Sequence, residues 1–289
     1  MNKGIVKLVS ILLLCIPLIA CQNTKQMDSN SLPPSSEQNQ IKHKQEGDNE
    51  YLDEQPQLEG GSERDVREPH PVSNDTLQKK YPNIVFLHGD PTINQVALTF
   101  DDGPDIRFTP QVLDVLAKHD VQATFFLFGA RAGENRELTK RIHDEGHAIG
   151  NHTYWHPNLP KESLERLRWE LTETERVIEE IIGFKPRLFR SPYGALNDEI
   201  VQVLGQNDNT VIGWDVDSLD WKQLSDDIIS DNILSNVGFG SIILMHDGTD
   251  WTADLSGTVQ ALDTVILKLK EDGTKFVTVP ELIGIPEAK

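Results

Sequence analysis

Residues 96–104 read VALTFDDGP, a mostly apolar run followed directly by two aspartates, a glycine and a proline. A short run of this kind bounded by a turn signal is typical of a buried strand that ends in a loop. Asp101 and Asp102 therefore lie where the strand gives way to the loop. Because adjacent carboxylates repel each other, both stay ionised only beside a cation or an arginine. Taken alone, the motif also fits a solvated acidic turn.

Outward from this stretch, short apolar runs alternate with amphipathic ones. Strands are predicted at 96–100, 123–128, 146–150, 188–189, 210–215, 241–245 and 275–279. Helices are predicted at 110–119, 135–145, 161–182, 198–204, 226–237 and 258–271. About seven strands that alternate with helices imply parallel pairing and an α/β fold, either a barrel or an open sheet.

The start of the chain is typical of an export signal. Lys3 and Lys7 flank the start of the largely apolar run 8–20, which is too short to span a bilayer. The run ends in LIAC at 18–21, which resembles the lipobox of bacterial lipoproteins. That resemblance implies cleavage before Cys21 and a lipid on its thiol. An ordinary secretory signal followed by a chance cysteine is the alternative.

Residues 21–80 are expected to form the lipidated cysteine and a disordered polar tether, since they are rich in Gln, Asn, Ser, Glu and Asp and poor in large apolar residues. Residues 81–289 are expected to form one folded domain. The sequence thus predicts an extracytoplasmic protein anchored by lipid to the bacterial cell membrane. Cys15 falls within the signal 1–20, so the mature domain holds no disulfide.

The charge of the chain restricts its partners. Lys and Arg number 27 against 46 Asp and Glu, a formal net charge of -19. Such a chain repels phosphate backbones, so nucleic acid is not an expected partner. An anionic lipid surface does not attract it either, which leaves a lipid anchor as the only expected membrane attachment.

A second polar cluster, HTYWH at 152–156, follows another predicted strand. Pro157 disfavours α geometry at His156, so the two histidines are placed in a loop. Two histidines and one aspartate are the ligand set of a catalytic zinc, which keeps a fourth position for water. Without a metal, His152 and His156 would be ordinary core or surface histidines.

Three further clusters also follow predicted strands: RSPYG at 190–194, DSLDW at 217–221 and IILMHD at 242–247. An arginine in the first of these can pair with one of the carboxylates of 101–102. Each cluster is weak evidence alone. All five together indicate a shared site, because the carboxyl ends of barrel strands meet at one rim.

The five motifs, in this order and at these intervals, resemble those of the polysaccharide deacetylases, the NodB-homology group of carbohydrate esterase family 4, over residues 93–280. The resemblance implies a distorted (β/α) barrel of about seven parallel strands. It also implies metal-dependent removal of acetyl groups, usually N-acetyl groups of amino sugars. A departure occurs at Ser191, where the family commonly has proline.

The resemblance also assigns roles. The implied metal ligands are Asp102, His152 and His156. Zn²⁺ is the expected ion, with Co²⁺, Ni²⁺ and Mn²⁺ as alternatives. The other implied residues are the base Asp101 with Arg190, the general acid His246 with Asp220, the oxyanion donor Tyr193 through its backbone N–H, and the acetyl-pocket residues Trp221 and Leu244. Asp217 is expected only to support its loop.

We therefore expect a hydrolase of amide bonds acting on an acetylated glycan, above all peptidoglycan or another N-acetylglucosamine polymer. The mechanism would use metal-activated water, an aspartate base and a histidine acid. An O-acetyl esterase of the xylan type is the enzymatic alternative. A glycan-binding module without catalytic activity is the alternative from another class, and the complete set of site residues argues against it.

Overall fold

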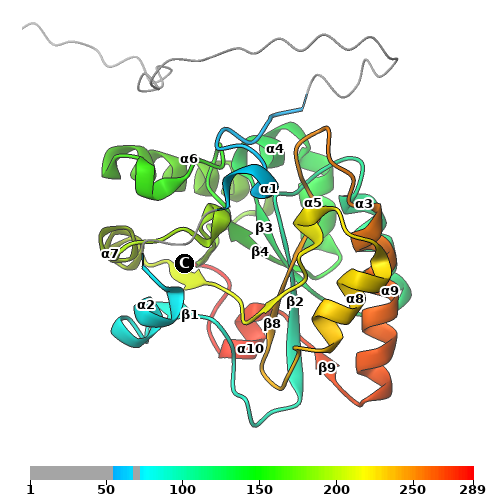
Figure 1. Cartoon of the computed structure of the whole chain (residues 1–289). Helices are drawn as coiled ribbons and strands as arrows, with labels where there is room; N and C mark the ends of the chain where they lie inside the picture. The colour runs from blue at the N-terminus through cyan, green and yellow to red at the C-terminus, as the bar shows by residue number, and fades with distance from the viewer. Residues whose placement is uncertain (1–54, 68–71) are drawn as a thin grey trace, which may run out of the picture. The chain divides into compact units, whose positions relative to one another are not determined.

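The computed structural model describes residues 55–67 and 72–289 (Figure 1). The predicted signal 1–20, Cys21 and most of the predicted tether lie outside the described residues. Within the described ranges, no helix combines the length and the apolar character that crossing a membrane requires.

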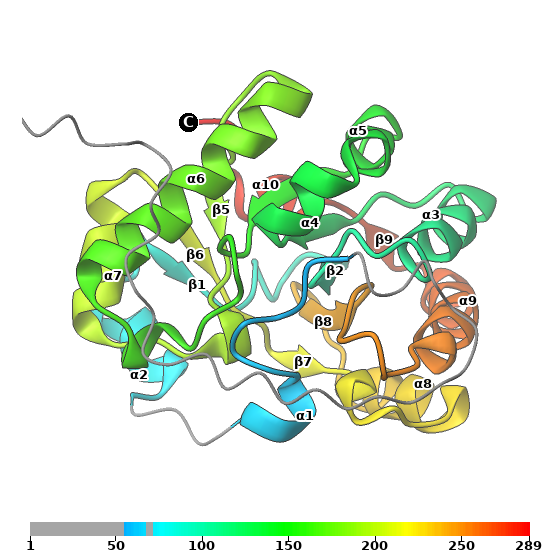
Figure 2. The same ribbon diagram turned by 90° about the horizontal axis from the view of Figure 1, so that it is seen from above.

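All the paired strands run parallel in a curled sheet (Figure 2). The strands are β1 (Val85–Phe86), β2 (Gln95–Asp101), β3 (Thr124–Leu127), β4 (Ala148–Asn151), β5 (Leu188–Phe189), β6 (Thr210–Ile212), β7 (Val216–Asp217), β8 (Ile242–His246) and β9 (Lys275–Phe276). Their order is β1-β6-β5-β4-β3-β2-β8-β7, and β9 pairs with β2. The predicted α/β class and distorted barrel are confirmed.

Helices lie around the sheet (Figure 2). They are α1 (Glu63–Val66), α2 (Asn74–Lys80), α3 (Thr109–Lys118), α4 (Gly129–Glu134), α5 (Arg136–Asp144), α6 (Leu164–Ile182), α7 (Asp198–Gln206), α8 (Asp226–Leu234), α9 (Ser256–Glu271) and α10 (Val279–Ile283). The longest helix, α6, begins three residues later than predicted, since the Ser163 side chain accepts a hydrogen bond from the Arg166 N–H. It ends where Gly183 takes a left-handed conformation, with φ 90°.

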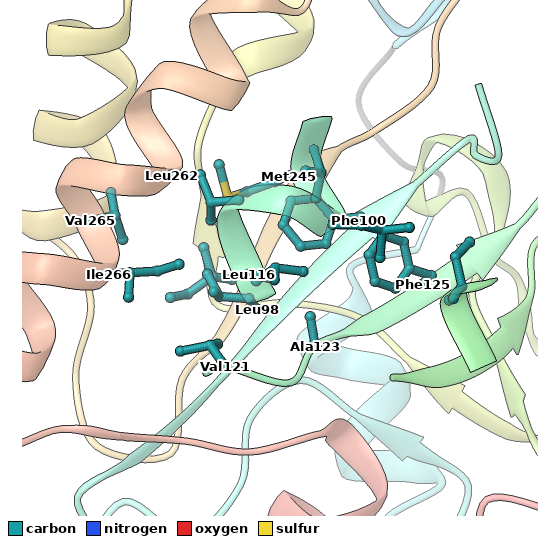
Figure 3. Close-up of a cluster of buried hydrophobic side chains, with 14 of the residues drawn as sticks. Leu98, Phe100, Leu116, Val121, Ala123, Phe125, Met245, Leu262, Val265 and Ile266 are labelled. Carbon is teal, nitrogen blue, oxygen red and sulfur yellow. The ribbon is translucent and has the colours of Figure 1, made fainter. Parts of the chain in front are cut away.

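The main core lies between the sheet and the helices α3 and α9 (Figure 3). Leu98 and Phe100 of β2 face this core, and Phe100 stacks on Phe125 of β3 with ring centroids 5.1 Å apart. Leu262 and Ile266 of α9 are fully buried there. This packing fixes β2 and β8, the two strands that end at the predicted catalytic residues.

Two strands and four helices were not predicted from the sequence. β1 and β7 have two residues each, too few to show a period. One strand was predicted at 210–215. The structure instead has β6, which ends at Ile212, and a separate strand, β7, which begins at Val216. The helices are α1, α2, α4 and α10.

The described part of the expected tether is folded against the domain. Helix α2 lies within it, and Leu77 is completely buried in a cluster with Val85 and Val203. The folded part of the chain therefore begins before residue 81. Leu77 is the one large apolar residue of α2, so the sequence shows no apolar periodicity from which this helix could be predicted.

Candidate active site

The five polar clusters predicted from sequence meet at the carboxyl ends of the strands. Asp101 is the last residue of β2, and His246 is the last residue of β8. The two residues are paired in register across the sheet. His152, Arg190 and Asp220 follow β4, β5 and β7, so the sheet brings together side chains that are more than a hundred residues apart in sequence.

Asp102, His152 and His156 form a buried cluster whose donor atoms lie within 4.8 Å of one another. The Asp102 Oδ1 atom lies 3.2 Å from the His152 Nε2 atom and 3.0 Å from the His156 Nε2 atom. Burial opposes ionisation of Asp102, but the two histidines hold the pKa of its carboxyl well below the usual range. Asp102 lies in the loop after β2 and His156 in the loop after β4. Both residues have a left-handed backbone, with φ 70° at Asp102 and φ 57° at His156.

Hydrogen bonds to the other ring nitrogens decide which atoms face the cluster. His152 Nδ1 lies 2.9 Å from the Arg190 carbonyl oxygen, which can only accept, so this nitrogen carries the proton. The Tyr193 hydroxyl donates to the Gly61 carbonyl at 2.8 Å and therefore accepts from His156 Nδ1 at 3.1 Å. In a neutral imidazole at either position the lone pair is therefore on Nε2, the atom that faces the Asp102 carboxylate.

A cation held between these three side chains would satisfy their facing atoms. The Asp102 Oδ1 and His156 Nε2 atoms are buried and have no hydrogen-bond partner among the described residues. Two neutral imidazoles and one carboxylate are the donor set that suits a borderline divalent metal such as zinc. The residues present therefore fit the metal predicted from the sequence.

Asp101 is held by a fully buried arginine. The Arg190 Nη1 atom donates to Asp101 Oδ1 at 2.8 Å and to the Thr99 hydroxyl at 2.7 Å. Its other nitrogens donate to the carbonyls of Ile212 and Gly213, and the guanidinium lies over the Phe126 ring. Since every side of this charge has a partner, Arg190 holds the Asp101 carboxylate in one orientation.

His246 is held by a second buried carboxylate. Its Nδ1 lies 2.7 Å from Asp220 Oδ1, and its backbone N–H donates to Asp220 Oδ2 at 2.8 Å. Thr258 also donates to that oxygen, at 3.0 Å. Burial lowers the pKa of His246, but Asp220 outweighs this effect and the pKa is raised to about 10. Such an imidazole holds a proton at neutral pH, as a general acid must.

The structure places the remaining predicted residues around this centre. Tyr193 has φ 60°, an unusual backbone for a non-glycine residue, and its side chain contacts the edge of the His156 ring. Trp221 lines a small cavity with Asp102 and His246, and among the described residues that lining does not include Leu244, which is buried within β8. Asp217 accepts from the Leu219 N–H and the Trp221 ring N–H, so it supports its loop.

Three further residues at the site were given no role by the sequence analysis, although one of them, Asp247, lies in the 242–247 cluster. Arg131, at the start of α4, is buried and donates to the carbonyls of Asp102 at 3.0 Å and Thr249 at 2.6 Å. A single arginine among small and apolar residues after a strand was a signal for it. The buried Asp247 accepts from the Thr109 hydroxyl at 2.5 Å, and Glu63 enters the site from α1. Glu63 lies in a polar stretch that gave no signal.

A family model of polysaccharide deacetylases matches residues 88–212. A peptidoglycan-N-acetylglucosamine deacetylase of Bacillus cereus is 44% identical over 188 residues, which cover 65% of this chain and 68% of that protein. The chain belongs to the polysaccharide deacetylase family. A peptidoglycan-N-acetylmuramic acid deacetylase of Bacillus subtilis, PdaC, is 39% identical over 67% of this chain, but the match spans only 39% of PdaC.

Solved structures agree with this assignment. A crystal structure of a peptidoglycan N-acetylglucosamine deacetylase, in complex with a hydroxamate compound, superposes with a TM-score of 0.72 at 39% identity. The match covers 75% of this chain and all of that one. The curled parallel sheet is thus the fold of this family.

Proposed function

We propose that this polysaccharide deacetylase removes N-acetyl groups from the amino sugars of peptidoglycan, releasing acetate and a free amine. The buried cluster of Asp102, His152 and His156 carries the proposal, because a metal ion would satisfy its buried atoms that have no hydrogen-bond partner among the described residues. Asp101 and His246, each held by a buried partner of opposite charge, supply the proton transfers. The names of the similar proteins support peptidoglycan as the substrate.

A divalent metal held by these three residues would polarise the acetamide carbonyl and lower the pKa of water. We propose Zn²⁺ as this ion because the donors are two nitrogens and one oxygen, with Co²⁺, Ni²⁺ or Mn²⁺ as substitutes. The contacts of the Nδ1 atoms with the Arg190 carbonyl and the Tyr193 hydroxyl would orient both rings so that Nε2 is available to the metal.

Proton transfer falls to two residues. Asp101 takes a proton from the water as it attacks the carbonyl, and Arg190 keeps the carboxylate facing the site. The backbone N–H of Tyr193 stabilises the negative charge on the carbonyl oxygen. His246 donates its proton to the amine as the carbon–nitrogen bond breaks, because an unprotonated amine is a poor leaving group. Trp221, which lines the cavity beside Asp102 and His246, bounds the methyl group.

Placement in the cell envelope supports the choice of polymer. The LIAC sequence at 18–21 supports lipidation at Cys21, and a lipid anchor would hold the domain beside the wall polymer. Incorporation of radiolabelled palmitate into the full chain, and its loss in Cys21→Ala, tests the anchor separately from the activity.

Acetate release from three substrates tests the proposed reaction. We expect release from peptidoglycan and from an N-acetylglucosamine oligomer, and none from O-acetylated xylan, when Zn²⁺ is supplied. Release from xylan alone would establish the esterase. Binding of peptidoglycan without acetate release from any substrate would establish the binding module.

A further inference from the structure

Residues 55–67, hereafter the strap, cross the carboxyl ends of the strands where the active site lies (Figure 2). Backbone hydrogen bonds fix the strap beside the metal ligands. The Glu59 N–H donates to the Trp155 carbonyl at 2.8 Å, and the Gly60 N–H donates to the His156 carbonyl at 3.1 Å. The strap is therefore packed on the loop that carries two of the three metal ligands.

Close packing at Gly60 shows that the strap is seated rather than loosely laid on the surface. A Cβ atom at this position would lie 2.2 Å from the Tyr193 hydroxyl and 2.7 Å from the His156 carbonyl oxygen. Leu58 is buried against Phe128 and Ala130. The strap is thus held on both sides of residue 59, by the apolar contacts of Leu58 and by the close backbone contact of Gly60.

Glu63 carries a carboxylate from the strap into the active site. Its side chain lines the same cavity as Asp102, His246 and Trp221, and the residue is only 7% exposed. With the strap in place, this cavity has a volume of about 10 Å³. That volume holds about one water molecule, so an acetamide group and its sugar have no room.

Arg67 closes the far end of the strap. Its Nη2 atom lies 2.9 Å from Asp217 Oδ2, and its guanidinium lies over the rings of Trp214 and Trp221 at 5.1 Å and 4.9 Å. Trp221 is predicted to line the acetyl pocket, so this contact covers one wall of that pocket. The Arg67 Nη1 atom lies 3.2 Å from Glu63 Oε2.

The contact with Arg67 only partly satisfies the Glu63 carboxylate. The Glu63 Oε2 atom is buried, and although it lies 3.2 Å from Arg67 Nη1, it has no hydrogen-bond partner among the described residues. Burying such a group costs free energy that an apolar side chain would not cost. The Glu63 side chain does match the chemistry of the site. A carboxylate on a methylene group has the shape and charge of acetate, the product of the proposed reaction.

We propose that the strap is a built-in competitor for the active site, in which Glu63 occupies the acetyl position as an acetate mimic and Arg67 latches the strap shut. The glycan chain enters only when the strap leaves. This inference rests on the proposed deacetylase activity for its kinetic test, while acetate binding tests it independently of turnover.

The experiment compares two pairs of variants in the full chain with Zn²⁺ supplied. Glu63→Ala is matched by Asp65→Ala, which removes an exposed carboxylate from the same helix, and Arg67→Ala is matched by Arg64→Ala. We expect the first member of each pair to lower KM for an N-acetylglucosamine oligomer by roughly tenfold, the effect of a strap closed about nine tenths of the time. The exposed controls leave KM unchanged.

Acetate titration gives the second measurement, followed by the fluorescence of Trp214 and Trp221. Glu63→Ala should bind acetate about tenfold more tightly than the parent chain, and Asp65→Ala should bind as the parent does. Unchanged or weaker acetate binding in Glu63→Ala would overturn the proposal and show that the strap completes the site. Tighter acetate binding without acetate release from any glycan would uphold the strap and refute the deacetylase.

Discussion

Arg190 joins the two halves of the active site at the scale of single residues. Its side chain holds the proposed base Asp101, and its backbone carbonyl accepts from the proposed metal ligand His152. Burial lowers the pKa of the Arg190 guanidinium, and the Asp101 carboxylate opposes this effect. Removing either partner would leave the other as an unpaired buried charge. The geometry therefore couples proton transfer to metal binding through one residue.

Removing the charge of Asp220 should change the pH dependence of the reaction. His246 must be protonated to act as the acid, so activity falls as the pH rises through its pKa. The Asp220 carboxylate raises this pKa, and Asp220→Asn should therefore move the alkaline limb of kcat/KM to lower pH by roughly one to three units. Thr258→Val, which leaves the carboxylate in place, serves as the control. An alkaline limb that does not move in Asp220→Asn would show that His246 is not the acid.

The Tyr193 hydroxyl should affect metal affinity. Tyr193→Phe removes the acceptor of the His156 Nδ1 proton, and loss of such a contact weakens metal binding roughly 10- to 100-fold. Competition with a chelator for Zn²⁺ measures this directly. Tyr81→Phe, whose hydroxyl donates to Asp198 at the surface, should bind Zn²⁺ as the parent chain does. Equal affinity in Tyr193→Phe would show that the hydrogen bond between the Tyr193 hydroxyl and His156 does not support metal binding.

At the scale of elements, helix α9 holds the strands that carry the reaction. Its buried face packs against β2 and β8, which end at Asp101 and His246 (Figure 3). The 3.6-residue spacing of apolar residues predicted this helix and α3 and α6 from sequence. The two-residue strands β1 and β7 could not be predicted, because their pairing partners β6 and β8 create them.

Leu262 and Leu267 of α9 offer a matched pair for testing this packing. Leu262 is completely buried and Leu267 is 45% exposed on the same helix. Leu262→Ala should lower the free energy of unfolding by about 2–5 kcal/mol, while Leu267→Ala should change it by less than about 0.5 kcal/mol. Denaturant unfolding measures both. Similar values for the two variants would mean that α9 does not depend on this face.

On the scale of the whole molecule, the active site draws on segments from both ends of the described chain. The order of the motifs carries the resemblance that implied the ligands, the base and the acid, and the structure brings these residues together at the carboxyl ends of the strands. The strap was not predictable, since its contacts with Trp155, His156 and Asp217 are tertiary and its composition is polar. The folded boundary was missed for the same reason at α2.

Leu77 tests where the folded domain begins. Its side chain is fully buried although the sequence placed it in a tether. Leu77→Ala should lower the free energy of unfolding by about 2–5 kcal/mol, whereas the exposed neighbour Thr76→Ala should have little effect. Thermal unfolding of the full chain gives the comparison. No loss of stability in Leu77→Ala would place the start of the domain after residue 80.

The central claim is that Asp102, His152 and His156 hold a metal with which Asp101 hydrolyses an acetamide. The most direct test is acetate release from an N-acetylglucosamine oligomer by the full chain after metal removal and after addition of Zn²⁺ or Co²⁺. We predict release only with metal, a loss of at least about 100-fold in Asp101→Asn, and normal release in the surface variant Asp90→Asn. Metal-independent release, or full activity in Asp101→Asn, would contradict the mechanism.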